Sequence, residues 1–269
     1  MTSNPNWHLL TEWFKPKSPE REAEFIQCLE ENLASPHIQF VHLFCEGSKP
    51  PIGNHTKLIF LELESRPTYA DLIQYSNKIG KDEHVVIANN DISFIAFQNF
   101  ILNPNEVACT TRHDASPNGP IWYRDVHQRD PKISQDAWFF STPLCLKGGD
   151  FYMGTQGCDN RIAWLFYESG NRIFNNGRDA IILHRHKDQA RNYTLDRLPN
   201  PYAHPRENGT VEFICKLTSY PRRQNVPLLE WDLLRSMTQS RAEFWFTWKL
   251  ILRKGLTKLR FNTMRTTEN

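Results

Sequence analysis

A short apolar run, residues 84–88, constrains the fold of this chain more than any other stretch. It reads HVVIA and ends abruptly in Asn89, Asn90 and Asp91. Consecutive small and β-branched apolar residues between polar flanks are typical of a strand buried on both faces of a parallel sheet. Asp91 then lies at the carboxyl end of the strand, where ligands bind in open α/β sheets. Asp91 could also be an ordinary turn residue that closes the strand. The rest of the chain has to decide between a ligand-binding carboxylate and a simple turn.

Segments with strand and helix periodicity alternate on both sides of this run. Alternation of this kind predicts βαβ units and an α/β fold whose central sheet is mostly parallel and flanked by helices. We expect one such domain over residues 1–223, with a long polar loop at 112–134 and a polar, proline-rich connector from 187 to its end. The spacing predicts strands at 7–14, 37–44, 57–63, 107–110, 137–140 and 180–183, and helices at 18–32, 69–78, 93–102 and 161–169.

The overall charge and the cysteines exclude several classes of protein. With a net charge of +2 over 269 residues, the surface is too balanced for general nucleic-acid binding, and we expect no nucleic-acid partner. The six cysteines contain no CxxC pair, which is typical of free thiols in a reducing compartment. Because no apolar stretch approaches the ~20 residues of a membrane span and the start lacks the pattern of a secretory leader, we expect a cytoplasmic protein.

The last part of the chain, residues 224–269, is expected to form a helical, basic amphipathic extension. Over 241–260, large apolar residues lie on one helical face, and lysines and arginines fill much of the rest. Such a helix docks on its own domain or lies on an anionic membrane surface. Both interpretations stay open, although docking is the more common case, so peripheral contact with the inner face of a membrane is one expectation for this segment.

Polar residues follow the predicted strands of the first half of the chain in a definite order. A short turn with Phe14 follows the first strand, Glu46 follows the second, Arg66 and Asn77 lie in RPTYADLIQYSN, and Asn89, Asn90 and Asp91 close the run described above. This order resembles that of nucleotide-sugar-dependent glycosyltransferases of the GT-A type, which have a single Rossmann-like domain, and especially glycosyltransferase family 2. The resemblance implies that these residues bind the nucleotide sugar. The family closes the metal strand with Asp-x-Asp, whereas here Asn89 replaces the first acid and Asp91 keeps the second.

The second half of the chain continues the resemblance, which covers the order of motifs over residues 7–187. Asp136 precedes an aromatic strand, Asp159 follows Gly157-Cys158 at the start of a helix, and His184 and His186 close the strand at 180–183. In the family an acid at this helix start deprotonates the acceptor hydroxyl, which implies that role for Asp159. A carboxylate at a helix start is also a common cap, and one residue can do both. Asp136 is expected near the sugar or the acceptor.

The resemblance implies an inverting glycosyltransferase that depends on Mn²⁺ or Mg²⁺. The donor is a nucleoside-diphosphate sugar, and the acceptor is a hydroxyl group of a glycan or lipid-linked saccharide, as in polysaccharide biosynthesis. Because the diphosphate leaves with two negative charges, a cation placed beside it stabilises the transition state. The expected metal ligands are Asp91, His184 and His186, since carboxylate oxygen and neutral imidazole suit these ions better than thiolate does.

Three alternatives stay open. A sugar nucleotidyltransferase has a related sheet, but its Gly-rich phosphate loop is missing from residues 14–22, which read FKPKSPERE. A non-catalytic carbohydrate-binding or scaffold protein of GT-A fold would have lost the Asp-x-Asp signature, which agrees with Asn89. Metal-dependent hydrolysis through His184 and His186 lacks the further acid and histidine clusters that such sites need.

Overall fold

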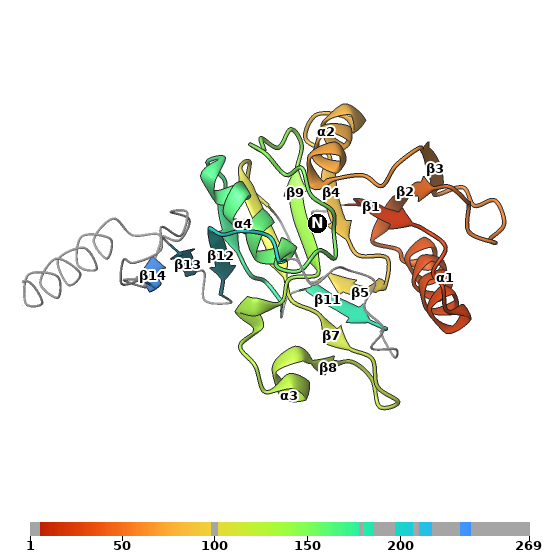
Figure 1. Cartoon of the computed structure of the whole chain (residues 1–269). Coiled ribbons are helices and arrows are strands. Elements are labelled where there is room, and N and C mark those ends of the chain that lie inside the picture. Colours follow the sequence, from red (N-terminus) through yellow and green to blue (C-terminus); the bar gives the residue numbers. More distant parts are fainter. Residues whose placement is uncertain are drawn as a thin grey trace, which may run out of the picture.

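The computed structural model describes residues 6–97, 102–177, 180–185, 197–206, 210–216 and 232–237. Its centre is a seven-stranded sheet in the order β10-β6-β9-β4-β1-β2-β3 (Figure 1). β9 runs antiparallel to β4 and β6, whereas the other pairings of this sheet are parallel. The predicted α/β fold with a mostly parallel central sheet is therefore confirmed. Its strands are β1 (Trp7–Trp13), β2 (Ile38–Glu46), β3 (Leu58–Leu63), β4 (His84–Ala88), β6 (Glu106–Thr110), β9 (Ala137–Ser141) and β10 (Arg172–Phe174).

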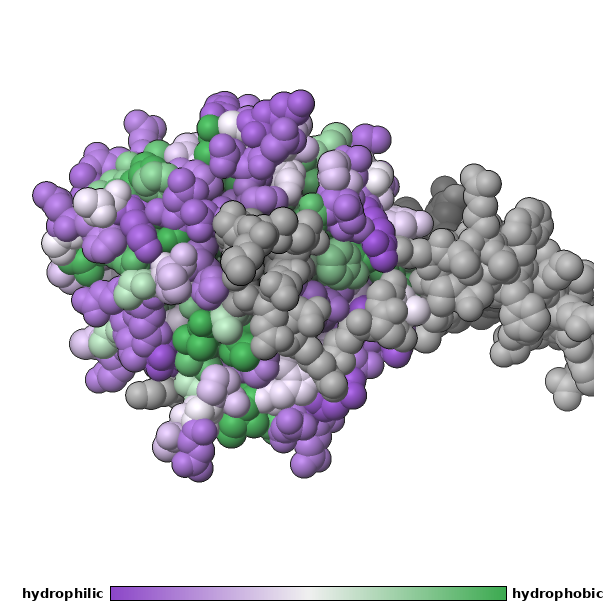
Figure 2. Space-filling view, turned by 180° about the vertical axis from the view of Figure 1, so that it is seen from behind, coloured by the Kyte–Doolittle hydropathy of each residue, from purple (hydrophilic) through white to green (hydrophobic). Residues whose placement is uncertain are grey.

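The central strand β4 is buried on both faces, as its composition predicts. Val86 and Ala88 belong to an apolar core on the side of helix α1 (Pro19–Ala34). Val85 and Ile87 belong to a second core, on the side of α2 (Tyr69–Ile79) and α4 (Cys158–Glu168). Where described residues are visible in Figure 2, hydrophilic side chains cover most of the face and apolar ones form small patches. The sheet is thus the layer between two cores, and its strand ends are left for polar residues.

Local capping places the starts of α1 and α2. The Ser18 hydroxyl accepts a hydrogen bond from the backbone N–H of Arg21, and Pro19 occupies the first helical turn. Thr68 and Asp71 form a reciprocal capping box at the start of α2. These bonds satisfy backbone N–H groups that a helix start leaves unpaired. As a result, the side chain of Arg21 lies in the first turn of α1, beside the end of β4.

A second, four-stranded sheet lies against the α1 side and corrects one prediction. Its order is β5-β11-β7-β8, formed by β5 (Ile92–Phe97), β11 (Ala180–His184), β7 (His113–Asp114) and β8 (Ile121–Trp122). The helix predicted at 93–102 is wrong, because residues 92–97 form β5. Its Ile and Phe residues favour a strand, β11 pairs with it antiparallel, and the Asn32 side chain bonds the backbone of Ile92 and Phe94. A short apolar run does not by itself distinguish the periodicity of a helix from that of a strand.

The segment 112–134, which was expected to be one long loop, contains more regular structure than predicted. It contains β7 and β8, the short helix α3 (Tyr123–His127) and a 3₁₀ turn, η1 (Pro131–Ile133). β7 pairs in parallel with β11, which sets His184 opposite Asp114. Two short strands far apart in sequence thus bring an imidazole beside a carboxylate.

A third sheet of three antiparallel strands corrects the connector predicted at 187–223. It consists of β12 (Tyr202–Pro205), β13 (Val211–Lys216) and β14 (Asp232–Met237). The core beside α4 includes Ala203, Val211 and Phe213. Their burial stabilises β12 and β13, which are short and lie in a proline-rich part of the sequence. Because β13 pairs with β14, the expected boundary at 223/224 falls between two paired strands, and residues 232–237 are a strand within the extension expected to be helical. The helix predicted at 241–260 lies outside the described residues. In the described part of the chain, no helix is long and apolar enough to cross a membrane.

Candidate functional site

A cleft of about 340 Å³ opens where the parallel strands of the central sheet end. Side chains reach it from several elements that are far apart in sequence. The ends of β1 and β4, the first turns of α1 and α4, the end of β11 and the residues flanking β6 and β9 all contribute. The lining includes Glu12, Phe14, Arg21, Arg66, Asn89, Asn90, Asp91, Arg112, Asp136, Cys158, Asp159 and His184.

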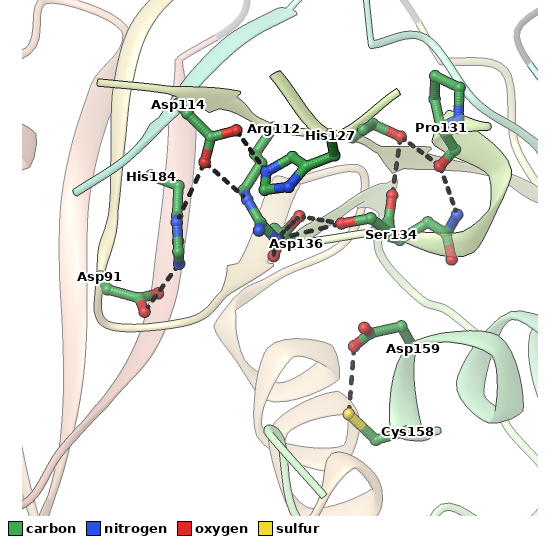
Figure 3. Close-up of polar contacts among 12 residues, drawn as sticks. Asp91, Arg112, Asp114, His127, Pro131, Ser134, Asp136, Cys158, Asp159 and His184 are labelled. Atoms are coloured by element: carbon green, nitrogen blue, oxygen red, sulfur yellow. Dashed lines mark hydrogen bonds and ion pairs between the residues drawn. The ribbon is translucent and has the colours of Figure 1, made fainter. Parts of the chain in front are cut away.

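Asp91 is paired with two cationic side chains. Its Oδ2 accepts a hydrogen bond from Arg21 Nη2 at 2.5 Å and lies 3.2 Å from His184 Nε2 (Figure 3 draws the contact with His184). Burial by itself would raise the pKa of Asp91, but His184 and Arg21 outweigh it and hold the pKa well below its usual range. Asp91 is therefore a carboxylate whose charge is already balanced by the protein.

His184 lies between two carboxylates. Its Nδ1 is 3.6 Å from Asp114 Oδ1, on the side opposite Asp91 (Figure 3). Burial alone would lower the pKa of His184, but Asp91 and Asp114 raise it to about 9. An imidazolium at neutral pH is a donor at both nitrogens, and here one faces Asp91 and the other Asp114.

Arg112 connects this pair to the opposite wall of the cleft. Its Nη1 donates to Asp136 Oδ1 at 3.1 Å and its Nε to Asp114 Oδ1 at 3.3 Å. The Ser134 hydroxyl donates to the other oxygen of Asp136, and the guanidinium lies 5.3 Å from the centre of the Tyr123 ring. Arg112 is thus held in a fixed orientation by charge on two sides and by an aromatic face.

Asp159 lies in the first turn of α4 and points toward Asp136 (Figure 3). The cap position itself belongs to Gly157, whose φ of 83° suits glycine, and no side chain caps the helix. Asp159 is therefore not the cap. Burial, and after it the charge of Asp136, raise the pKa of Asp159 to about 7. The Cys158 thiol donates to Asp159 Oδ1 at 3.1 Å. A carboxyl group in this condition exchanges protons near neutral pH, which is what a general base requires.

Arg66 and Glu12 form the other end of the cleft. Arg66 Nη2 donates to Glu12 Oε2 and to the carbonyl oxygen of Met153, each at 2.7 Å. The guanidinium lies 5.7 Å from the centre of the Phe14 ring and 5.5 Å from that of Tyr152. Burial raises the pKa of Glu12, although Arg66 opposes the shift. Flat aromatic and guanidinium surfaces at this end suit a planar ligand group.

The structure brings most of the predicted site residues into this one cleft. Glu46 instead lines a neighbouring cleft, which shares Phe14 and Arg66 with the first. Asn77 lies in α2, away from both, and its side-chain amide exchanges hydrogen bonds with the backbone of Leu144. His186 lies outside the described residues. The predicted residues that line the cleft are Phe14, Arg66, Asn89, Asn90, Asp91, Asp136, Asp159 and His184.

Sequence reasoning missed the cations that hold these acids. Arg21 lies within an acidic helix start, where a lone arginine looks like a solvated residue. Arg112 lies two positions after the strand-like run at 107–110, and this place near a strand end is the signal that could have indicated it. Glu12 and Asp114 became visible only when the sheets placed them beside Arg66 and His184.

The donor set does not fit the predicted Mn²⁺ or Mg²⁺ site. Among the described residues, no group of three or more His, Cys, Asp and Glu side chains is arranged to hold a metal ion. Asp91 is bonded to a guanidinium, Asn89 supplies a neutral amide in place of the first acid of the Asp-x-Asp signature, and both nitrogens of His184 face carboxylates. A divalent ion that binds a diphosphate still needs one or two protein carboxylates, and Asp91, the carboxylate at this strand end, is bonded to Arg21 and His184.

Comparison with known proteins gives only distant structural neighbours. No family model matches the chain, and no curated protein matches it. A mannosyltransferase, PcManGT from Pyrobaculum calidifontis in complex with GDP-Man and Mn²⁺, is 13% identical with a TM-score of 0.46, over 71% of this chain and 59% of that chain. HddC from Yersinia pseudotuberculosis is 8% identical with a TM-score of 0.37, over 67% of this chain and 93% of that chain. TM-scores at this level carry no argument about what this chain binds or does.

Proposed function

We propose that this protein is an inverting glycosyltransferase that moves a sugar from a nucleoside-diphosphate sugar to a hydroxyl group of a glycan or lipid-linked saccharide. One observation carries the proposal. A half-buried carboxyl group with a pKa of about 7, Asp159, faces a cleft that several guanidinium groups line at the carboxyl ends of parallel strands. The order of motifs in the sequence, which resembles that of the GT-A type, supports the same function.

In the proposed reaction Asp159 is the general base. It takes the proton of the acceptor hydroxyl as the oxygen attacks the anomeric carbon, and the bond to the diphosphate breaks on the opposite side. Asp136 is in position to orient the sugar or the acceptor, because Arg112 and Ser134 hold its carboxylate fixed. Arg66, with Phe14 and Glu46 close by, is assigned to the nucleoside end. Charge on the departing diphosphate is balanced by cationic side chains.

The test measures transfer and hydrolysis with a panel of UDP-, GDP-, dTDP- and CDP-sugars. A glycosyltransferase is expected to hydrolyse one of these slowly without an acceptor. Asp159→Asn keeps the shape of the side chain and is expected to lower this rate by roughly 10²-fold or more while donor binding survives. Asp150→Asn, which changes an exposed carboxylate, is the matched control and should have native activity.

The alternative, a non-catalytic carbohydrate-binding or scaffold protein, is favoured by Asn89 in place of an acid. That alternative predicts no turnover of any sugar nucleotide in the panel and no saturable binding of a nucleoside diphosphate. A native rate in Asp159→Asn would leave the transferase function standing and move the role of base to Asp136.

A further inference from the structure

Each of the three arginines that line the cleft is bonded to at least one carboxylate. Arg21 is bonded to Asp91, Arg66 to Glu12 and Arg112 to Asp136. No cluster of unbalanced carboxylates is left among the described residues to attract a divalent ion. Guanidinium groups, in contrast, have five N–H donors each and can bind a phosphate oxygen while keeping a carboxylate partner. The cleft is therefore built for an anion more than for a cation.

Arg21 is bonded to the carboxylate that would hold a metal ion at the end of β4. Its Nη2 lies 2.5 Å from Asp91 Oδ2, and the two side chains are only 14% and 9% exposed. Glu24 binds Nη1 at 2.7 Å, and the guanidinium lies 4.7 Å from the centre of the Phe25 ring. Three contacts thus fix a guanidinium at the end of β4, which distinguishes Arg21 from a mobile surface arginine.

The amide at position 89 fits this arrangement. A guanidinium can pair with a single carboxylate, whereas a Mg²⁺ ion is usually bound by one or two carboxylates together with phosphate oxygens of the ligand. Asn89 and Asn90 line the cleft beside Asp91 and add no charge. A carboxylate at 89 would offset more of the positive charge that Arg21 and His184 supply at this strand end.

Arg112 offers a second guanidinium on the other side of the cleft. Among the described residues, its hydrogen bonds use Nε and Nη1, which leaves the Nη2 side for a ligand oxygen. Two arginines on different elements can contact different oxygens of one diphosphate, and such charge-assisted bonds are stronger than neutral ones.

We propose that the cleft binds the diphosphate of its donor without a divalent cation, and that Arg21, held on Asp91, takes the place of the metal ion. This inference rests on the proposed function and specifies how its donor is bound. The charge that develops on the leaving diphosphate is then stabilised by guanidinium groups that are already oriented before the donor arrives.

The direct test uses the full chain and needs no variant. Binding of UDP, GDP, ADP, dTDP, CDP and inorganic pyrophosphate is measured by calorimetry, once with EDTA and once with MnCl₂. We expect at least one nucleoside diphosphate to bind with EDTA present, with a Kd within about threefold of that measured with Mn²⁺. Binding that appears only with Mn²⁺ would overturn the inference and leave the proposed function intact. Absence of binding in both conditions would overturn the proposed function itself.

Two substitutions separate binding by Arg21 from binding through a metal ion. Asp91→Asn removes a negative charge beside the phosphate site while Glu24 and Phe25 still hold Arg21, so affinity should be retained or increase, whereas a metal site would lose binding. Arg21→Gln should weaken nucleoside diphosphate binding by roughly tenfold to a hundredfold, because it removes charge-assisted bonds. Arg172→Gln is the control, since Arg172 is bonded to Glu106 at 2.5 Å and lies outside the cleft; its affinity should stay native. Loss of binding in Asp91→Asn, or native affinity in Arg21→Gln, contradicts the inference.

Discussion

Asp159→Asn is expected to make the protein more stable than the native chain at neutral and higher pH while it removes activity. Folding raises the pKa of Asp159 from its ordinary 3.8 to about 7. Between these pH values the unfolded chain has released the proton and the folded protein retains it, so stability falls as the pH rises through this window. Below the lower pKa both states hold the proton, and this contribution to stability no longer changes with pH. Across the whole window the free energy of unfolding falls by at most about 4 kcal/mol.

Asn is a neutral mimic of the protonated acid, and its Oδ1 can still accept from the Cys158 thiol. The free energy of unfolding is measured by urea titration of both proteins from about pH 5 to pH 8. From the shifted pKa, the difference should grow by roughly 2.5 kcal/mol in favour of the variant across this range. Asp150→Asn is the control, because its carboxylate is exposed. Parallel stability curves for the native protein and Asp159→Asn would refute both the raised pKa of Asp159 and the case for Asp159 as the base.

Three further predictions concern other parts of the structure. Asn32→Ala removes hydrogen bonds of 2.8 and 2.9 Å to the backbone of Ile92 and Phe94 and should cost about 1–3 kcal/mol in urea unfolding; an unchanged midpoint would show that β5 does not depend on this side chain. Glu46→Gln should weaken binding of a nucleoside diphosphate but not of pyrophosphate, because Glu46 lines the neighbouring cleft; equal effects on both ligands would contradict that placement. Amide hydrogen exchange over 112–134 should slow when the donor binds, since Arg112 connects this segment to the cleft; equal protection in the free and bound protein would argue against it.

Much of the fold was predictable because its signals are local. The strand at 84–88 has a composition that suits burial on both faces, and β4 forms there. The predicted helices at 18–32 and 69–78 correspond to α1 and α2. Each is capped by a residue, Ser18 or Thr68, whose bonding partner lies only three positions further along the chain. β5 was not predictable in the same way, because its Ile and Phe residues fit either period over so short a stretch. Its pairing with β11 decided the matter.

The sequence by itself determined which polar residues end the strands and begin the helices, and the order of its motifs predicted Asp91 and Asp159 for one candidate site. Only the tertiary structure decided their charge state. Arg21 is 70 positions from Asp91 and His184 is 93 positions from it, so no local pattern could indicate that both would neutralise its carboxylate. The pKa of Asp159 likewise depends on burial and on Asp136. Periodicity and capping act over a few residues, whereas desolvation and ion pairing act through space between segments that only the completed fold brings together.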